Sequence, residues 1–486
     1  MELQFHKTPM TCLKQVLSQH GDKELTQELR LPDGMPDVGA VIAAWGQILI
    51  RGKQWESDRV GVTGGVQIWV LYEPEDGSGH QCIEAWIPFE QDWDLDEPAP
   101  DGKIVVIPAL RQVDARSVTP RKLMLKVSMN LFNKAYIADT IQLYNPDAMP
   151  EDVQLLIREH TFHVPTETGE RTFTLDEEVT MPQDQPAPEK LIYCSLIPRI
   201  NESKVMAGKL VFRGSCQLHV LYQSADGVHA TDLEFPFAQY GDLEQDYDPE
   251  AQVSIYPVIT NFEAELGALN ALRMKAGLLA QYVVSDRKNI RLVQDAYSTQ
   301  KQLKLQSAPL EMLQIIGSDQ WNHHAKCACD LEGKPVDTVF YADIPKMQGF
   351  GEDRHQYFSG RFQSLYYDAD GKLSCHNCKW EHSEPVAEDA ICETEITVQH
   401  ISAEEAVMDM TPVDMGQDAM EAVCDITVGD NIEKDPNAPS LIVRRMGHES
   451  LWELAKRTGS TVAGIQAVNG LDAEPEQGTT LILPVS

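Results

Sequence analysis

The sequence predicts a mainly β protein, built from tandem antiparallel β-sandwich-like repeats and ending in a small β-α-α-β domain. Three observations lead to this fold class. Similar segments recur about 150 residues apart, Asp-Gly dipeptides separate runs of alternating apolar residues, and the last 46 residues have the periodicity of two short helices between two strands.

The internal repeat is clearest in two pairs of segments. QELRLPDGMPDVGAVI (27–42) and EEVTMPQDQPAPEKLI (177–192) share their proline spacing at an offset of 150 residues. The same offset relates GGVQIWVLY (64–72) to GSCQLHVLY (214–222), and further along the chain it slips to 148–149. QSLYYDADGK (363–372) indicates a third, degenerate copy. Each copy has about 145 residues, enough to bury a core of its own, unlike the short units of a solenoid.

Each copy is expected to be mostly β-strand. Asp76-Gly77, Asp226-Gly227 and Asp370-Gly371 lie between alternating apolar runs, which is a strong signal for hairpins. KLMLKVSMNLFN (122–133) alternates as a half-buried strand does. Three segments are interpreted as candidate short helices: Thr11–His20, Pro150–Glu159 and Ala403–Met408.

These patterns divide the chain into five parts. The predicted bounds are 1–148 and 149–300 for two sandwich-like repeats, 301–430 for the degenerate third repeat, 431–440 for a polar linker and 441–486 for the C-terminal domain.

Net charge and hydropathy restrict the function and the location. A formal charge of −35 argues against nucleic acid and anionic membranes as partners, because both need basic patches. It keeps a protein soluble and equally suits a basic partner surface. The longest apolar candidate, Val38–Ile50, has 13 residues and is too short to cross a bilayer. Without an apolar run of signal-peptide length at the N-terminus, the protein is expected to stay in the cytoplasm.

The ten cysteines are scattered and are expected to be reduced thiols. The third copy is richest in residues of the zinc-binding type, since it has Cys327-x-Cys329, Cys375-x-x-Cys378 and nearby histidines. These four thiols could complete a tetrahedral zinc site if their strands are adjacent. The alternative is that they are small buried side chains. That alternative is preferred, so no cofactor is expected.

Three common catalytic motifs are absent from the sequence. No Gly-Lys pair is followed by Ser or Thr in a phosphate-binding loop, and there is no Gly-x-Ser-x-Gly or His-Glu-x-x-His motif. His160 and His163 lie beside acidic residues and are interpreted as a solvated helix end rather than a metal site. The protein is therefore expected not to be an enzyme.

The C-terminal domain has clear start and stop signals. Leu441–Arg445 is expected to be a strand, and Ser450 is a plausible N-cap for a helix that ends at Gly459. Thr461–Asn469 is expected to form a second short helix, and Thr480–Pro484 the closing strand.

This segment resembles the LysM domain, whose pattern it matches along its whole length. The matching residues include Gly447, Glu449-Ser450-Leu451-Trp452, Asn469-Gly470-Leu471 and Leu481-Ile482-Leu483-Pro484. His448 departs from the pattern, because the family usually has Asp there. The resemblance implies a shallow groove for N-acetylglucosamine-containing glycans such as peptidoglycan, lined by Gly447, His448, Glu449, Ser450, Leu451, Asn469, Leu471 and Ile482. The alternative is that Leu451, Trp452, Ile465 and Ile482 are simply core.

The repeats resemble the SPOCS domain, well over roughly residues 10–300 and poorly over 300–430. SPOCS repeats followed by one LysM domain are the arrangement of SipL-type spore-coat morphogenetic proteins. The resemblance implies a scaffold in the mother-cell cytosol, at the forespore surface, that docks through LysM to the ATPase of the coat basement layer. Because peptidoglycan lies beyond a membrane from that compartment, a protein partner is preferred to a glycan. Self-association of the acidic repeats is a further possibility.

Overall fold

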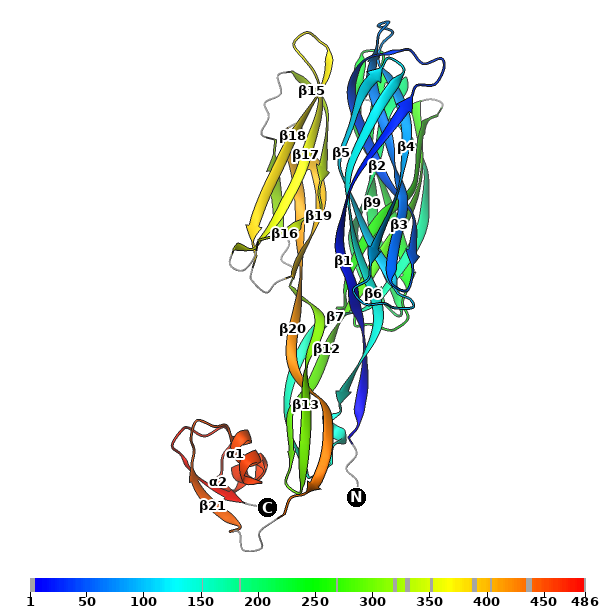
Figure 1. Cartoon of the computed structure of the whole chain (residues 1–486). Coiled ribbons are helices and arrows are strands. Elements are labelled where there is room, and N and C mark those ends of the chain that lie inside the picture. The colour runs from blue at the N-terminus through cyan, green and yellow to red at the C-terminus, as the bar shows by residue number, and fades with distance from the viewer. Residues whose placement is uncertain are drawn as a thin grey trace.

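The computed structural model describes residues 5–150, 152–182, 185–267, 270–317, 321–327, 333–349, 353–386, 391–402, 404–433 and 439–484. The prediction of a mainly β fold is confirmed, since 74% of the described residues are strand and 5% are helix. The strands form several small antiparallel sheets, and the helices lie in the C-terminal segment and in one short 3-10 turn, η1 (Pro146–Ala148), within the described part of the chain (Figure 1).

The first part of the chain forms two three-stranded sheets. The strands are β1 (Lys7–Arg30), β2 (Val38–Trp55), β3 (Arg59–Pro74), β4 (Gln81–Asp94), β5 (Lys103–Thr119) and β6 (Lys122–Tyr144). One sheet has the order β1-β6-β5 and the other the order β2-β3-β4. Side chains of both sheets meet in one core, as in a sandwich.

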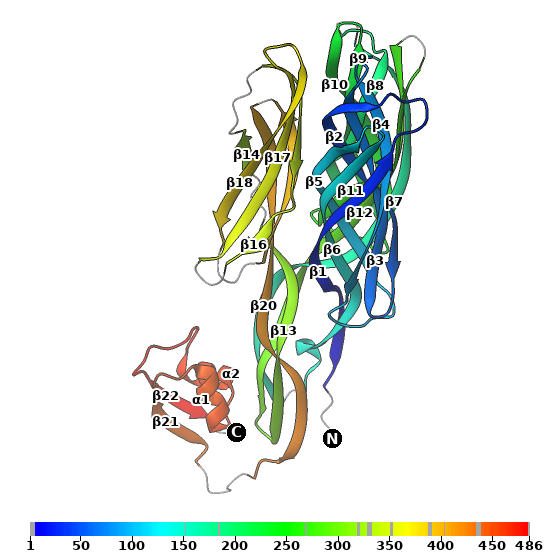
Figure 2. The same cartoon turned by 45° about the horizontal axis from the view of Figure 1, so that its top comes forward.

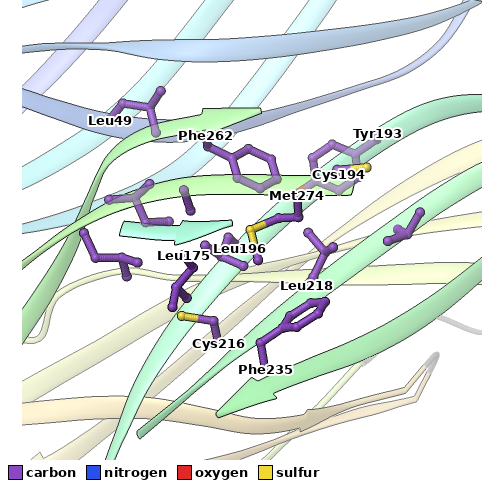
Figure 3. Close-up of a cluster of buried hydrophobic side chains, with 14 of the residues drawn as sticks. Leu49, Leu175, Tyr193, Cys194, Leu196, Cys216, Leu218, Phe235, Phe262 and Met274 are labelled. Atoms are coloured by element: carbon purple, nitrogen blue, oxygen red, sulfur yellow. The ribbon is translucent and has the colours of Figure 1, made fainter. Parts of the chain in front are cut away.

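The next part repeats this strand order. The strands are β7 (Val153–Thr180), β8 (Lys190–Met206), β9 (Lys209–Ser224), β10 (Gly227–Asp242), β11 (Gln252–Leu266) and β12 (Ala271–Ser298). The sheets are β7-β12-β11 and β8-β9-β10, so the first and last strands of the unit again pair with each other. Figure 3 shows the core between these sheets, where Phe262 and Met274 lie close to Leu218.

The third part follows the same plan, and apart from its long last strand its strands are mostly shorter. The strands are β13 (Lys301–Gly317), β14 (Trp321–Lys326), β15 (Lys334–Ala342), β16 (Lys346–Gln348), β17 (His355–Tyr367), β18 (Leu373–Pro385), β19 (Ile391–Ile401) and β20 (Glu405–Asn431). β20 pairs with β13, β14 and β19, and β17 pairs with β15, β16 and β18. This unit lies beside the other two in both views (Figures 1 and 2).

Local contacts explain why the sequence repeats where it does. The N–H of Met35 donates to the carbonyl of Pro32 at 3.3 Å, and 150 residues later the N–H of Gln185 donates to the carbonyl of Pro182 at 3.1 Å. The two prolines therefore begin equivalent turns. The slip in offset from 150 to 148 arises in the following hairpin, because Tyr72 pairs with Gln81 whereas its counterpart Tyr222 pairs with His229.

The apolar run Val38–Ile50 is a strand that is buried on both faces. Ile48 and Ile50 point into the first core, whereas Trp45 and Leu49 point into the core of the second unit. Leu49 is seen beside that second core in Figure 3. A strand that is covered on both faces has a continuous run of apolar residues instead of an alternating pattern. Burial between two cores therefore accounts for the apolar character of Val38–Ile50. In the described part of the chain, no helix has the length and apolar character of a membrane span.

The prediction of three short helices before the C-terminal domain is wrong. Thr11–His20 lies within β1, residues 153–159 within β7 and residues 405–408 within β20, while residue 403 lies outside the described residues. In β1 a register shift between Gln15 and Leu17 turns Val16 and Leu17 inward together. Such a bulge breaks the alternation of a strand and imitates the spacing of an amphipathic helix.

The paired first and last strands of each unit extend into a common stalk. β1–β6, β7–β12 and β13–β20 run past the sheets as three ribbons, visible in the lower half of Figure 1. Their side chains form a separate small core that includes Tyr144, Val293 and Ile426, one from each ribbon. The Tyr144 hydroxyl accepts the N–H of Ile426 at 3.0 Å. Because β1, β7 and β12 run through both a sheet and the stalk, they reach lengths of 24 to 28 residues.

Candidate functional site

The C-terminal segment has the predicted β-α-α-β order. Its elements are β21 (Leu441–Arg445), α1 (Leu451–Thr458), α2 (Val462–Asn469) and β22 (Thr480–Pro484). The two strands pair antiparallel. One side of the sheet packs against the helices, and the resulting core contains Leu454, Ile465, Leu481 and Leu483.

Ser450 begins α1, as the sequence predicts. Its hydroxyl accepts the N–H of Glu453, and the Glu453 carboxylate accepts the N–H of Ser450, so both ends of a capping box are present. These hydrogen bonds lower the pKa of the exposed Glu453 carboxyl. Gly459 ends the helix with φ +64°, a left-handed conformation that favours glycine.

The predicted groove residues from 447 to 450 form the loop between β21 and α1, and Leu451 begins α1. The amide nitrogen of Gln477 donates to His448 Nδ1 at 2.6 Å, and the Leu451 N–H donates to the Glu474 carboxylate. These contacts join this loop to the loop between α2 and β22. The Glu449 carboxylate binds Arg457 on α1 at 2.7 and 2.8 Å. Gly447 faces open space, with no atom near the position of a Cβ.

Asn469 forms hydrogen bonds that complete the sheet edge. Its Nδ2 donates to the carbonyl of Ile482 at 2.7 Å, and its Oδ1 accepts the Ile482 N–H at 2.8 Å. The same Nδ2 donates to the Ile465 carbonyl at 2.8 Å. The side chain thus imitates a neighbouring strand for β22, and its polar atoms are engaged within the domain.

The eight predicted groove residues therefore occupy two places. Residues 447 to 451 lie in the loop before α1 and at its first residue, while Asn469 ends α2, Leu471 follows it and Ile482 lies on β22. Leu451 is 1% exposed and belongs to the core, and Leu471 is partly buried against it. Ile482 is 38% exposed and points away from the helices. The binding of a glycan to these residues stays a prediction.

Sequence reasoning missed an apolar surface on the same domain. Leu441, Val443 and Ile482 are 55%, 68% and 38% exposed, and they lie on the side of the sheet opposite the helices. Val443 and Ile482 are direct register partners across β21 and β22. We call these three residues the strand face. The sequence of β22 already indicates the strand face, because successive side chains of a strand point to opposite sides. Leu481 and Leu483 face the core, so Ile482 between them faces outward.

The cysteines of the third copy are not arranged as a zinc knuckle. Cys375 and Cys378 lie three residues apart on β18, so their side chains point to opposite faces of the strand. Cys378 belongs to the core of the third unit, whereas Cys375 packs against the core of the second. Burial raises the pKa of the Cys375 thiol to about 12, which disfavours the thiolate that zinc needs. Cys327 is partly buried, and Cys329 lies outside the described residues.

Other potential ligands of the third copy also find partners in the protein. The imidazoles of His323 and His382 contact each other with ring centres 4.4 Å apart, and His382 Nε2 lies 2.6 Å from Glu384. Within the described ranges, no three His, Cys, Asp or Glu side chains converge in a way that could hold a metal ion.

These features define a multi-unit antiparallel β protein that carries a small helix-containing domain at its C-terminal end. Residues 188–266, which span β8 to β11, match the family model of the SipL, SPOCS domain. The chain is thus similar to SipL in its second unit, and the match supports a SipL-like protein connected with sporulation. Neither the curated proteins nor the solved structures gave a match.

Proposed function

We propose that the protein is a non-enzymatic scaffold in spore-coat assembly, and that it binds a partner protein through the strand face of its C-terminal domain. The exposure of Leu441, Val443 and Ile482 on one side of a two-stranded sheet carries this proposal. Exposed apolar side chains that gather on one surface are typical of protein–protein contacts, whereas single ones are ordinary. Four of the nine large apolar side chains that are exposed in the described chain lie in this domain.

The charge distribution supports a docking role for this domain. It contains four Lys or Arg residues and five Asp or Glu residues, so almost all of the net charge of −35 lies in the body. An apolar contact made by the domain is therefore opposed by little local charge, while the acidic body resists nonspecific association.

The resemblance to SipL-type proteins suggests the partner. We propose the ATPase of the coat basement layer, met in the mother-cell cytosol at the forespore surface. The experiment is a pull-down of the purified ATPase by the full chain and by a chain that lacks residues 441–486. Loss of binding on deletion is the expected result, and undiminished binding contradicts the proposal.

A glycan is the second candidate, because the chain resembles LysM and because Gly447, in the loop before α1, faces open space. Against it, both N–H groups of the Asn469 amide already donate to the Ile482 and Ile465 carbonyls and cannot also donate to a sugar hydroxyl. Co-sedimentation of the full chain with purified peptidoglycan separates the two candidates. Sedimentation that the deletion of 441–486 abolishes, without binding to the ATPase, would favour the glycan.

A further inference from the structure

The C-terminal domain contacts the stalk through one side of α1. Tyr297, near the end of β12, is 6% exposed and belongs to the same core cluster as Leu451 and Leu454 of α1. Its ring lies 4.9 Å from that of Trp452 at an interplanar angle of 65°, an edge-to-face arrangement that aromatic pairs prefer. A residue 155 positions earlier in the chain thus completes the packing of the domain around Trp452.

Polar contacts surround this aromatic pair. Asp295 Oδ2 accepts the indole N–H of Trp452 at 2.8 Å, and both carboxylate oxygens lie 2.6–2.7 Å from Lys456 Nζ. The Tyr297 hydroxyl donates to the carbonyl of Ser460 at 2.9 Å. Burial raises the pKa of Tyr297 to about 12, so the hydroxyl keeps its proton for this bond. The Asp295 side chain is 24% exposed and that of Lys456 42%, which places this ion pair partly out of water.

The contact orients the domain. In both views the helices lie on the side toward the stalk and β21 lies on the far side (Figures 1 and 2). Trp452 and Lys456 are engaged with Asp295, whereas Leu441 and Val443 remain exposed. The surface that contacts the stalk and the strand face are therefore on opposite sides of the domain.

We infer that the end of β12 is a docking site for helix α1 of the chain's own C-terminal domain, with Asp295 and Tyr297 as its binding residues and Trp452 and Lys456 as their counterparts. Docking there holds the domain in one orientation and leaves the strand face open to a partner. The role of the strand face rests on the proposed function, but the docking itself does not.

Few contacts suffice for this site because the two surfaces are tethered. β20, itself part of the stalk, ends at Asn431, and β21 begins at Leu441, so only a short connection separates them. A tether of this length gives an effective concentration of the order of millimolar, and a weak interface is then mostly occupied. Partner binding that requires a defined orientation gains from such preorganisation.

Hydrogen–deuterium exchange of the full chain tests the site. The variants are Asp295→Ala and Tyr297→Phe, which lie outside the C-terminal domain and leave its sequence intact. Each removes charge-assisted or buried hydrogen bonds, so we expect the amides of residues 451–460 to exchange about tenfold faster. Asp286→Ala is the matched control, because Asp286 is on the same strand and binds only its neighbours Arg287 and Lys288 in the hydrogen bonds seen for it. Exchange of 451–460 should not change there.

A double-mutant cycle between Asp295→Ala and Lys456→Ala, with the same exchange rates as the readout, is the second test of the docking site. If the two residues act on each other, the double variant exchanges little faster than either single variant. Unchanged exchange of residues 451–460 in both Asp295→Ala and Tyr297→Phe, or strict additivity in the cycle, overturns the inference. Should deletion of 441–486 leave binding to the ATPase intact, the proposed function fails while the exchange result stands.

Discussion

His219 Nε2 on β9 lies 3.2 Å from Asp337 Oδ2 on β15, so one imidazole joins the second and third units of the protein. Its Nδ1 lies 2.9 Å from Asp232. Burial by itself lowers the pKa of His219, but the Asp337 and Asp232 carboxylates outweigh it and raise the pKa to about 10. The ring is therefore an imidazolium at neutral pH and forms an ion triad between two sheets.

This triad predicts a loss of stability at alkaline pH. The pKa of His219 is raised in the folded state, so its contribution is fully present below the unfolded pKa of about 6.5 and is lost as the pH rises through about 10. His219→Gln should cost about 3 kcal/mol at pH 7, because it leaves Asp337 buried without its partner. Urea unfolding at pH 7 and pH 10.5 measures both effects.

The control for this prediction lies on the same hairpin. His229 pairs with Asp226 at 3.0 Å, but both side chains are more accessible to water. His229→Gln should therefore change the free energy of unfolding by less than about 1 kcal/mol. Equal effects of the two substitutions would contradict a special role for His219.

The repeated glycines are expected to be intolerant of a side chain. A Cβ at Gly64 would overlap the carbonyl oxygen of Leu49 and lie 2.8 Å from the ring of Phe89. Gly214 has the equivalent surroundings, with Arg199 and Phe237. Gly64→Ala and Gly214→Ala should each destabilise the protein by about 1–3 kcal/mol. Thermal unfolding measures this, with Gly447→Ala as the control that has open space.

Asn469 is expected to stabilise the closing strand of the C-terminal domain. Asn469→Ala removes all three of its hydrogen bonds to Ile482 and Ile465 and should destabilise the domain by about 2 kcal/mol. Exchange of the β22 amides in the full chain should rise accordingly. Asn289→Ala, which changes an exposed pair with Thr161, should leave those amides unaffected. Equal exchange in wild type and Asn469→Ala would refute this role.

Thiol reactivity should separate the cysteines by burial. Cys424 is exposed, whereas burial raises the pKa of Cys82, Cys194 and Cys216. A thiol reagent at pH 8 should modify Cys424 within minutes and these three only after denaturation. Mass spectrometry of the modified peptides gives the order. Rapid reaction of Cys194 in the native protein would show that its core opens.

The sequence predicts the recurring strands well because their signals are local. Turn prolines such as Pro32 and Pro182, and glycines such as Gly64 and Gly214, meet the same close contacts in the first two units, so they recur at a regular offset. The Asp-Gly hairpins and the caps of α1 are equally local, and the structure places them as expected. The strand face also has a local signal, the alternation around Ile482.

Features that depend on contacts between distant segments leave no local signal in the sequence. The bulge at Val16 and Leu17 imitates a helix, and only the pairing of β1 with β6 settles its structure. The contact of Tyr297 with Trp452 joins residues 155 positions apart that have no shared pattern. The division of Cys375 and Cys378 between two cores depends on how the third unit lies against the second.

A single charged substitution in the strand face tests whether this surface binds the partner. Val443→Asp places a charge on the face, and Val118→Asp places the same charge on a comparably exposed valine of β5 in the body. In a pull-down of the purified coat ATPase by the full chain, we expect Val443→Asp to reduce binding at least tenfold and Val118→Asp to leave it unchanged. Wild-type binding by Val443→Asp, or equal losses in the two variants, would contradict the account.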